Sequence, residues 1–233
     1  MRLVSWNILQ GGGRRLADIL DALSGWNCDL VTLQEVRSSH VAEIADHLAG
    51  LGLRHSYMSS VGSKSENGIF LAARDPIDGG DFIQDRSGLC HILEAEVSGM
   101  SLLPVHFPQK AAQIPLFEAI LQDTESLLSL DALLIGDLNC GIPFEDSTAK
   151  TFVNAARFQA LKEAGWVDIY RAKNGPDARD YSWISPRSGR GFRYDHALAS
   201  PSFAKQVDRV FYDHTVRENG LSDHSALLVD LGS

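Results

Sequence analysis

Several apolar segments of this sequence end in acidic or amide side chains, and this repeated feature constrains the fold most. In the clearest case, the apolar run 133–135 predicts a buried strand, Gly136 ends its regularity, and Asp137 and Asn139 follow. Because side chains alternate along an extended backbone, Asp137 and Asn139 lie on one side of it. A carboxylate and an amide at the end of a strand supply an acceptor and a donor to a bound group.

The other predicted strands and helices alternate along the chain. Arg2–Trp6 and Leu30–Leu33 predict strands that lead into Asn7 and Glu35. Apolar residues at helical spacing indicate amphipathic helices, which fall at about 16–25, 41–50, 111–128 and 151–164. Short extended runs separated by Gly, Ser, Asp and Pro predict antiparallel sheet, at 53–59, 68–74, 91–97 and 101–106. Two later runs, 194–199 and 225–229, are also strand-like.

Length and composition are those of an ordinary globular chain. With 233 residues, 44% of them hydrophobic, we expect one domain over residues 1–233. The formal net charge of −9 supplies no global attraction for nucleic acid or anionic membrane, but acidity does not exclude a nucleic-acid substrate where positive charge is local or comes from a metal. No apolar run reaches membrane-spanning length. The three cysteines show no CxxC spacing, so we expect a reduced, cytoplasmic monomer without a disulfide framework or zinc site.

One segment departs from the acidic balance of the chain. Residues 171–193 are rich in polar residues, Gly and Pro. The segment has two acidic residues, Asp177 and Asp180, against six basic ones: Arg171, Lys173, Arg179, Arg187, Arg190 and Arg193. A locally basic segment of this kind can supply sequence-independent contacts to a nucleic-acid backbone.

The polar residues at the strand ends form one potential cluster. The carboxyl ends of four predicted strands carry Asn7, Glu35, His106 and the pair Asp137/Asn139, and the starts of two more carry Asp195 and the pair Asp223/His224. If the two groups of strands run antiparallel, all six ends meet on one rim. Like charges gathered there repel and raise each other's pKa, which favours a bound cation. Oxygen-rich ligands favour Mg²⁺ or Mn²⁺ over zinc.

Each of these residues also has an ordinary explanation when it is taken alone. Glu35 could be a solvated strand-end carboxylate, Asp137 with Asn139 could be turn chemistry, and His224 could lie in a surface turn. His196 directly follows Asp195, so its side chain points to the opposite face and is expected to pack in the interior. The interpretation as a site therefore depends on the whole set occurring together.

The motifs that carry these residues resemble the endonuclease/exonuclease/phosphatase superfamily, and within it the exonuclease III and abasic-site endonuclease branch. The matching segments occur in the family's order from one end of the chain to the other: SWN (5–7), LQE (33–35), HFPQ (106–109), GDLN (136–139), YSW (181–183), GFRYDHALAS (191–200) and SDH (222–224). The resemblance implies an α/β sandwich, in which two packed mixed β-sheets are flanked by helices.

The resemblance also implies a metal site. By position, Glu35 resembles the family's principal metal ligand, and Asn7 and Asp223 should lie close to the ion. The implied cofactor is Mg²⁺, with Mn²⁺ as a substitute. Such an ion polarises the phosphoryl oxygen and stabilises the leaving alkoxide.

The catalytic roles are implied in the same way. Asp195 and His224 resemble the family's Asp–His pair, in which the carboxylate orients the imidazole beside the scissile phosphate. Asp137 resembles the residue that positions or deprotonates the attacking water, Asn139 the one that helps to hold the phosphate, and His106 could donate to a phosphate oxygen. Whether Asp137 or His224 takes the proton is left open.

For the substrate, the resemblance implies DNA. Trp183, Phe192 and Tyr194 match aromatic residues that form a pocket for a base-free sugar in the abasic-site branch. The basic segment, Arg193 included, is expected to contact the DNA. The leading hypothesis is therefore a Mg²⁺-dependent phosphodiesterase of DNA, acting as an exonuclease III-like or abasic-site nuclease.

Three departures from that branch keep other hypotheses open. Leu9 stands where a polar residue often supports the metal, His106 replaces the usual tyrosine, and the connections after Gln109 and Asn139 are short. The short connections, His106 and the net charge favour the same chemistry on a small or lipid phosphoester, such as a phosphoinositide or sphingomyelin head group, whereas the YSW and GFRYDHALAS segments oppose it. A catalytically silent binding scaffold is disfavoured, because every catalytic position is kept.

Overall fold

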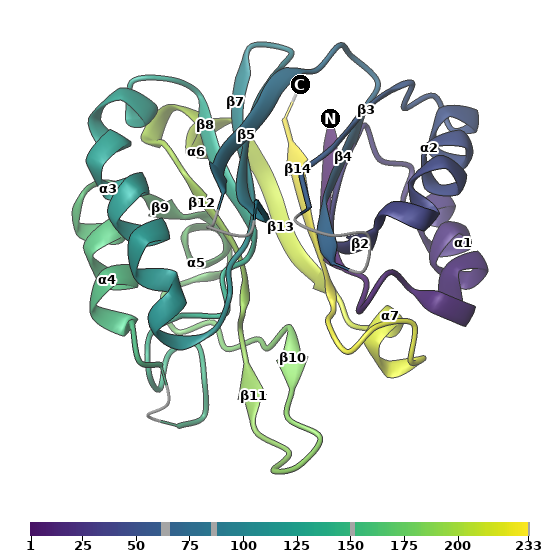
Figure 1. Cartoon of the computed structure of the whole chain (residues 1–233). Helices are drawn as coiled ribbons and strands as arrows, with labels where there is room; N and C mark the ends of the chain where they lie inside the picture. The colour runs from purple at the N-terminus through teal and green to yellow at the C-terminus, as the bar shows by residue number, and fades with distance from the viewer. Residues whose placement is uncertain (62–65, 85–87, 150–151, 233) are drawn as a thin grey trace.

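Two mixed β-sheets pack face to face, with helices on their outer faces (Figure 1). The computed structural model describes residues 1–61, 66–84, 88–149 and 152–232. Within these residues each sheet has six strands. This arrangement confirms the predicted α/β sandwich of two packed mixed sheets flanked by helices.

The first sheet has the order β13-β14-β1-β2-β4-β3. Its central strand β1 runs parallel to β2 and antiparallel to β14. The strands are β1 (Arg2–Asn7), β2 (Leu30–Arg37), β3 (His55–Met58), β4 (Asn67–Ala73), β13 (Val207–Asp213) and β14 (Ala226–Leu231).

The second sheet has the order β5-β6-β7-β8-β12-β9. Strand β8 lies between β7, to which it is parallel, and β12, to which it is antiparallel. The strands are β5 (Asp78–Gln84), β6 (Cys90–Val97), β7 (Met100–His106), β8 (Ala132–Asp137), β9 (Val167–Asp168) and β12 (Asp195–Ala199). A separate ribbon pairs β10 (Trp183–Ile184) with β11 (Gly191–Phe192) and projects from the end of the sandwich opposite the two termini (Figure 1).

Helices α1 and α2 cover the first sheet, and α3 and α4 cover the second (Figure 1). The helices are α1 (Leu16–Trp26), α2 (Val41–Gly50), α3 (Ile114–Leu128), α4 (Ala155–Glu163), α5 (Ile169–Asn174), α6 (Pro201–Gln206) and α7 (Thr215–Glu218). In the part of the chain that the structure describes, three 3₁₀ turns precede helices, at Gly13–Arg15, Ser38–His40 and Lys110–Gln113.

The central strands are buried on both faces, which explains their unbroken apolar runs. In β1, Leu3 packs in the core between the sheets and Val4 packs against α1 and α2. In β8, Leu133 faces the same central core and Leu134 faces α3 and α4. Alternation of side chains along each strand therefore builds three apolar layers from two sheets.

The middle of the chain differs from its predicted form. The extended runs predicted as antiparallel sheet are divided, with β3 and β4 in the first sheet and β6 and β7 in the second. Strand β5 was not predicted, because Gly79 and Gly80 read as a break. The predicted helix 151–164 begins at Ala155 among the described residues, and residues 150–151 lie outside them.

Candidate active site

Strand pairing brings the predicted polar strand ends to one end of the sandwich. Because β1 and β2 run parallel, Asn7 and Glu35 lie at the same edge of the first sheet. In the second sheet, His106 and Asp195 each pair in register with Asp137. The ribbon β10–β11 projects from this end (Figure 1), and Trp183 forms an isolated bridge with His224. We call this end the rim.

The Asn7 amide joins carboxylates from the two sheets. Its Nδ2 donates to Glu35 Oε1 and to Asp137 Oδ2, each at 3.1 Å. Its Oδ1 accepts from the backbone N–H of Leu9 at 3.0 Å, and this bond fixes the orientation of the amide. The other oxygen of Glu35 accepts from the Gln10 N–H at 2.7 Å. One side chain therefore holds two carboxylates together across the sheet interface.

Unusual backbone conformations direct the rim side chains. Glu35 and Asn139 are not glycines, yet they have φ angles of 63° and 46°. Gly136 has φ 144°, and a Cβ there would lie 2.1 Å from the Val105 carbonyl oxygen. Only glycine fits at that position, and left-handed conformations of other residues concentrate at functional sites. Asn139 is held by donation from its side chain to the Phe107 carbonyl at 2.9 Å.

Asp195 and His224 form a buried hydrogen-bonded pair. His224 Nδ1 lies 2.7 Å from Asp195 Oδ2, and neither side chain is more than 8% exposed. The other ring nitrogen, Nε2, faces Asp137 Oδ2 at 3.9 Å. The carboxylate of Asp195 thus fixes the imidazole with one nitrogen directed toward the second carboxylate, an arrangement suited to acid, base or charge-stabilising chemistry.

The donor atoms at the rim fit a hard cation. The carboxylates Glu35, Asp137 and Asp223 offer oxygen ligands, and Asp223 Oδ1 is buried without a hydrogen-bond partner while its Oδ2 accepts from Trp183 Nε1 at 2.9 Å. Among the described residues, ligand atoms of Asp137, Asp195 and His224 lie within 4.8 Å of one another. Within that group, Asp195 and His224 are already joined by a hydrogen bond.

Burial and neighbouring charges shift the pKa values of the rim groups. Burial raises the pKa of Asp137 to about 7, in spite of the opposing effect of His224. Burial lowers the pKa of His106 to about 4 and keeps its ring neutral. Burial also lowers the pKa of His224, but Asp195 and Asp137 outweigh this effect and raise it to about 10. The rim therefore pairs a carboxyl that ionises near neutrality with a protonated imidazole.

Several supporting residues were not predicted from the sequence. Ser222 Oγ donates to the Asn7 carbonyl at 2.6 Å and accepts from the His224 N–H at 3.1 Å. Ser182 Oγ accepts from the Asp195 N–H at 3.2 Å, and the Tyr212 hydroxyl donates to the Asp195 carbonyl at 2.5 Å. The two serines directly precede Asp223 and Trp183 in the SDH and YSW motifs. This position was the one feature of the sequence that could have indicated their supporting role.

The three aromatic residues predicted to bind substrate lie together as a wall of contacting rings. The rings of Phe192 and Tyr194 stack at 5.2 Å, and Trp183 lies 5.6 Å from each of them. Phe152, which was not predicted, packs edge-on against Phe192 and Tyr194 at 6.1 and 6.0 Å. We call these four residues the aromatic wall.

A small hollow lies beside the aromatic wall. Its volume is about 150 Å³. Its lining residues are Gln109, Lys110, Gln113, Asn139, Phe152, Val153 and Tyr194. Because Asn139 belongs to the rim and Tyr194 to the wall, the hollow connects the two. Val153 is 75% exposed at its edge, so the hollow has an apolar lip open to solvent.

The predicted substrate contact of Arg193 has to be corrected. Its side chain is 1% exposed and points into the interior, where Nε donates to Asp146 Oδ1 at 2.8 Å and Nη1 to Asp168 Oδ1 at 3.0 Å. Arg171 is also buried and pairs with Asp146. Two of the six basic residues of segment 171–193 are therefore neutralised internally. Arg187 and Arg190, in the β10–β11 ribbon, are exposed.

We expect Arg193→Met to cost about 3–5 kcal/mol of unfolding free energy, because the substitution leaves buried carboxylates without their partner. The matched control is Arg209→Met. Arg209 pairs with Asp230 at 3.0 Å but is 58% exposed, so its substitution should cost only about 0–1 kcal/mol of unfolding free energy. Urea unfolding measures both. Equal losses in the two variants would contradict the assignment of Arg193 as a buried charge partner.

The same ion cluster predicts acid sensitivity. Burial alone would raise the pKa of Asp146 and Asp168, but Arg193 outweighs it and lowers the pKa of both. The unfolded state therefore binds more protons below about pH 4, and stability falls with pH by up to about 1.4 kcal/mol per pH unit for each carboxylate. Urea unfolding between pH 2 and 5 should show a shallower fall in Arg193→Met than in wild type. Parallel curves would rule out this linkage.

His196 lies where its position in the strand predicts. It is fully buried, its Nε2 contacts the Cys140 carbonyl at 2.9 Å, and its ring lies 4.6 Å from Phe158. Its side chain is thus on the α3–α4 side of the second sheet, away from the Asp195 carboxylate.

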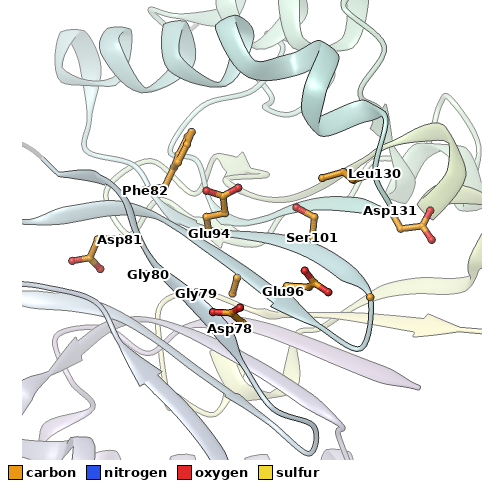
Figure 2. Close-up of a pocket in the computed structure, with 12 residues that line it drawn as sticks. Asp78, Gly79, Gly80, Asp81, Phe82, Glu94, Glu96, Ser101, Leu130 and Asp131 are labelled. Atoms are coloured by element: carbon orange, nitrogen blue, oxygen red, sulfur yellow. The ribbon is translucent and has the colours of Figure 1, made fainter.

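A second hollow of about 530 Å³ lies on the second sheet (Figure 2). Strands β5 and β6 form much of it, and the described residues that line it include no basic one. Its carboxylates are Asp78, Asp81, Glu94, Glu96 and Asp131. Such a lining repels anionic phosphoesters, so this larger hollow does not compete with the rim as a site for them.

The fold and rim define a two-sheet sandwich with a carboxylate–imidazole cluster at one end. The chain belongs to the Endonuclease/Exonuclease/phosphatase family, whose profile matches residues 4–224. It is therefore a phosphoric ester hydrolase, as the motifs predicted. None of the curated proteins is similar enough in sequence to count as a match.

Solved structures with the same fold cover the whole chain. An AP endonuclease from Archaeoglobus fulgidus is 20% identical with a TM-score of 0.86. The 3′–5′ exonuclease NExo from Neisseria meningitidis is 21% identical with a TM-score of 0.83, and the 3′ phosphatase NExo from Neisseria bound to a product DNA hairpin is 20% identical with a TM-score of 0.83. Each match covers 100% of both chains. At these identities the matches show the shared fold. Among the described residues, no helix has the length and apolar character needed to cross a membrane.

Proposed function

We propose that this chain is a divalent-cation-dependent phosphodiesterase of DNA, with Mg²⁺ as the cation and Mn²⁺ as a substitute. The observation that carries the proposal is the Asp195–His224 pair, whose free Nε2 faces Asp137 at 3.9 Å beside the small hollow and the aromatic wall. This geometry combines groups for hydrolysis with a surface for a sugar.

The cation would be held by Glu35, Asp223 and the neighbouring Asn7. The unpartnered buried oxygen of Asp223 and the raised pKa of Asp137 both support a positive charge there. When bound, the cation supplies polarisation of the phosphoryl oxygen and stabilisation of the leaving alkoxide. Asn7 keeps the ligand Glu35 and the catalytic Asp137 at a fixed separation.

Proton transfer is assigned to Asp137. The pKa of His224 is raised to about 10, so the ring carries a proton at neutral pH and stabilises negative charge on the phosphate. Asp137 has a pKa of about 7 and can accept a proton from water. Asn139, held beside Asp137, is placed to orient the phosphate, and neutral His106 can donate to one of its oxygens.

Three features support DNA as the substrate. The hollow of about 150 Å³ beside the aromatic wall offers space for a small group such as a base-free sugar. The exposed Arg187 and Arg190 can contact a phosphate backbone. Among the solved structures with this fold, one is an AP endonuclease and another is bound to a DNA hairpin.

A small or lipid phosphoester is the second candidate. Its specific support is charge: the chain carries −9 overall, and Arg171 and Arg193 are unavailable to a polyanion because carboxylates neutralise them in the interior.

The test is a Mg²⁺-titrated cleavage assay on duplex DNA with one abasic-site analogue, run beside the intact duplex and a hairpin with a 3′-phosphate. Metal-dependent incision at the lesion or release of the 3′-phosphate is expected. If the folded protein leaves all DNA substrates intact but releases phosphate from a panel of phosphoinositides or other small phosphoesters, the DNA proposal is wrong and the second candidate replaces it.

A further inference from the structure

The buried ion cluster lies directly behind the aromatic wall. Arg193 stands between Phe192 and Tyr194 in the chain, and the alternation of the extended backbone directs its side chain away from their stacked rings. The position of Arg193 is therefore linked to that of both rings through the backbone on either side.

The cluster also holds the loop that follows Asn139, which we call the 140–148 loop. The backbone N–H of Arg193 donates to the Asp146 carbonyl at 2.7 Å, and its side chain binds the Asp146 carboxylate. The second carboxylate oxygen of Asp146 accepts from the Ile142 N–H at 2.8 Å, which folds the loop on itself. Near its end, Ser147 forms a bridge with Phe192. The loop and the wall thus share one anchor.

Asp168 makes the anchor rigid. It accepts from two guanidinium nitrogens of Arg193 and from the Arg171 N–H, where it caps helix α5. The Arg193 guanidinium also lies over the Tyr170 ring at 5.2 Å. The two arginines and two aspartates balance in charge and are at most 9% exposed. A lysine cannot bind both carboxylates with this forked geometry.

We propose that Arg193 is a positioning residue for substrate binding: through Asp146 it fixes the aromatic wall and the 140–148 loop relative to the rim, and so sets the KM for DNA. This inference rests on the proposed function. The Asp195–His224 pair has additional hydrogen bonds with Ser222, Ser182 and Tyr212. Among the described residues, no hydrogen bond joins the side chains of this pair to Arg193, Asp146 or Asp168.

The kinetic test uses two mild variants, Arg193→Lys and Asp146→Asn, at a temperature where circular dichroism shows both to be folded. The matched control is Arg209→Lys. We expect KM for abasic duplex DNA to rise by about tenfold, the effect of losing one or two well-packed contacts, with kcat changed by less than about threefold. Hydrolysis of bis(p-nitrophenyl) phosphate, which lacks the base-free sugar that the wall is proposed to contact, should keep its kcat/KM. A loss shared equally by both substrates, or an unchanged KM for DNA, would overturn the proposal.

A second readout does not depend on activity. The Thr148 amide at the end of the loop donates to the Gly191 carbonyl at 3.3 Å. Hydrogen exchange of the Ile142 and Thr148 amides should accelerate by at least about tenfold in both variants, because local opening becomes easier, while exchange of the Val4 amide in β1 stays at the wild-type rate. Unchanged exchange at Ile142 and Thr148 would refute the anchoring itself. If the wild type does not cleave DNA, the proposed function fails, and accelerated exchange then still supports Arg193 as the anchor of the wall.

Discussion

His224→Ala is expected to lower kcat for phosphodiester hydrolysis by on the order of 10³-fold or more, the effect of removing an imidazole that acts on the reacting phosphate. His224 Nδ1 is 2.7 Å from Asp195, and its protonated ring is the group best placed to stabilise charge beside Asp137. The loss should appear in kcat rather than in KM, because the interaction is strongest in the transition state.

The control for this prediction is His55→Ala. His55 is an exposed histidine of β3, so its substitution should leave the kinetics unchanged. Asp195→Asn should reproduce much of the His224 effect, since the imidazole would lose the carboxylate that keeps it protonated and oriented. Steady-state kinetics on abasic duplex DNA and on bis(p-nitrophenyl) phosphate measures all three. Near-normal turnover by folded His224→Ala would remove it from the mechanism.

The second large effect is expected at the metal site. Glu35→Ala should abolish Mg²⁺-dependent turnover, because in the proposed function this carboxylate, which accepts from Asn7, would bind the cation. The Mg²⁺ dissociation constant should rise by at least about 10–100-fold, the range seen when residues that orient a metal site are removed. The fold should remain, since the Glu35 side chain is 20% exposed and belongs to no core cluster.

Glu94→Ala is the matched control for Glu35. Glu94 is an exposed carboxylate in the second, acidic hollow (Figure 2), so its loss should affect neither metal affinity nor turnover. Isothermal titration with Mg²⁺ and thermal unfolding separate the two roles. Wild-type stability together with full activity in Glu35→Ala would show that the residue is not a metal ligand. If instead Glu94→Ala weakens Mg²⁺ binding, the metal has been placed at the wrong end of the sheet.

Much of the fold could be predicted because its signals are local. Strand β8 and the first three helices follow from apolar periodicity, and the polar ends of β1, β2 and β8 mark the rim in the sequence itself. To bring the acidic strand ends of the second sheet together, β8 and β12 have only to pair antiparallel, which places Asp195 opposite Asp137. Strand β5 was missed because its two glycines favour a turn, whereas pairing with β6 supplies the hydrogen bonds that keep it extended.

The sequence by itself determined which chemical groups the site contains, because a strand that ends in Asp or Glu carries that residue to the sheet edge in any packing of the strands. Only the tertiary structure decided which arginine side chains are exposed and able to contact a substrate. Arg193 lies in a basic segment beside two wall residues, but its partners Asp146 and Asp168 are 47 and 25 residues away in the chain. No local pattern shows that pairing, and burial of a charge depends on partners that only folding brings within reach.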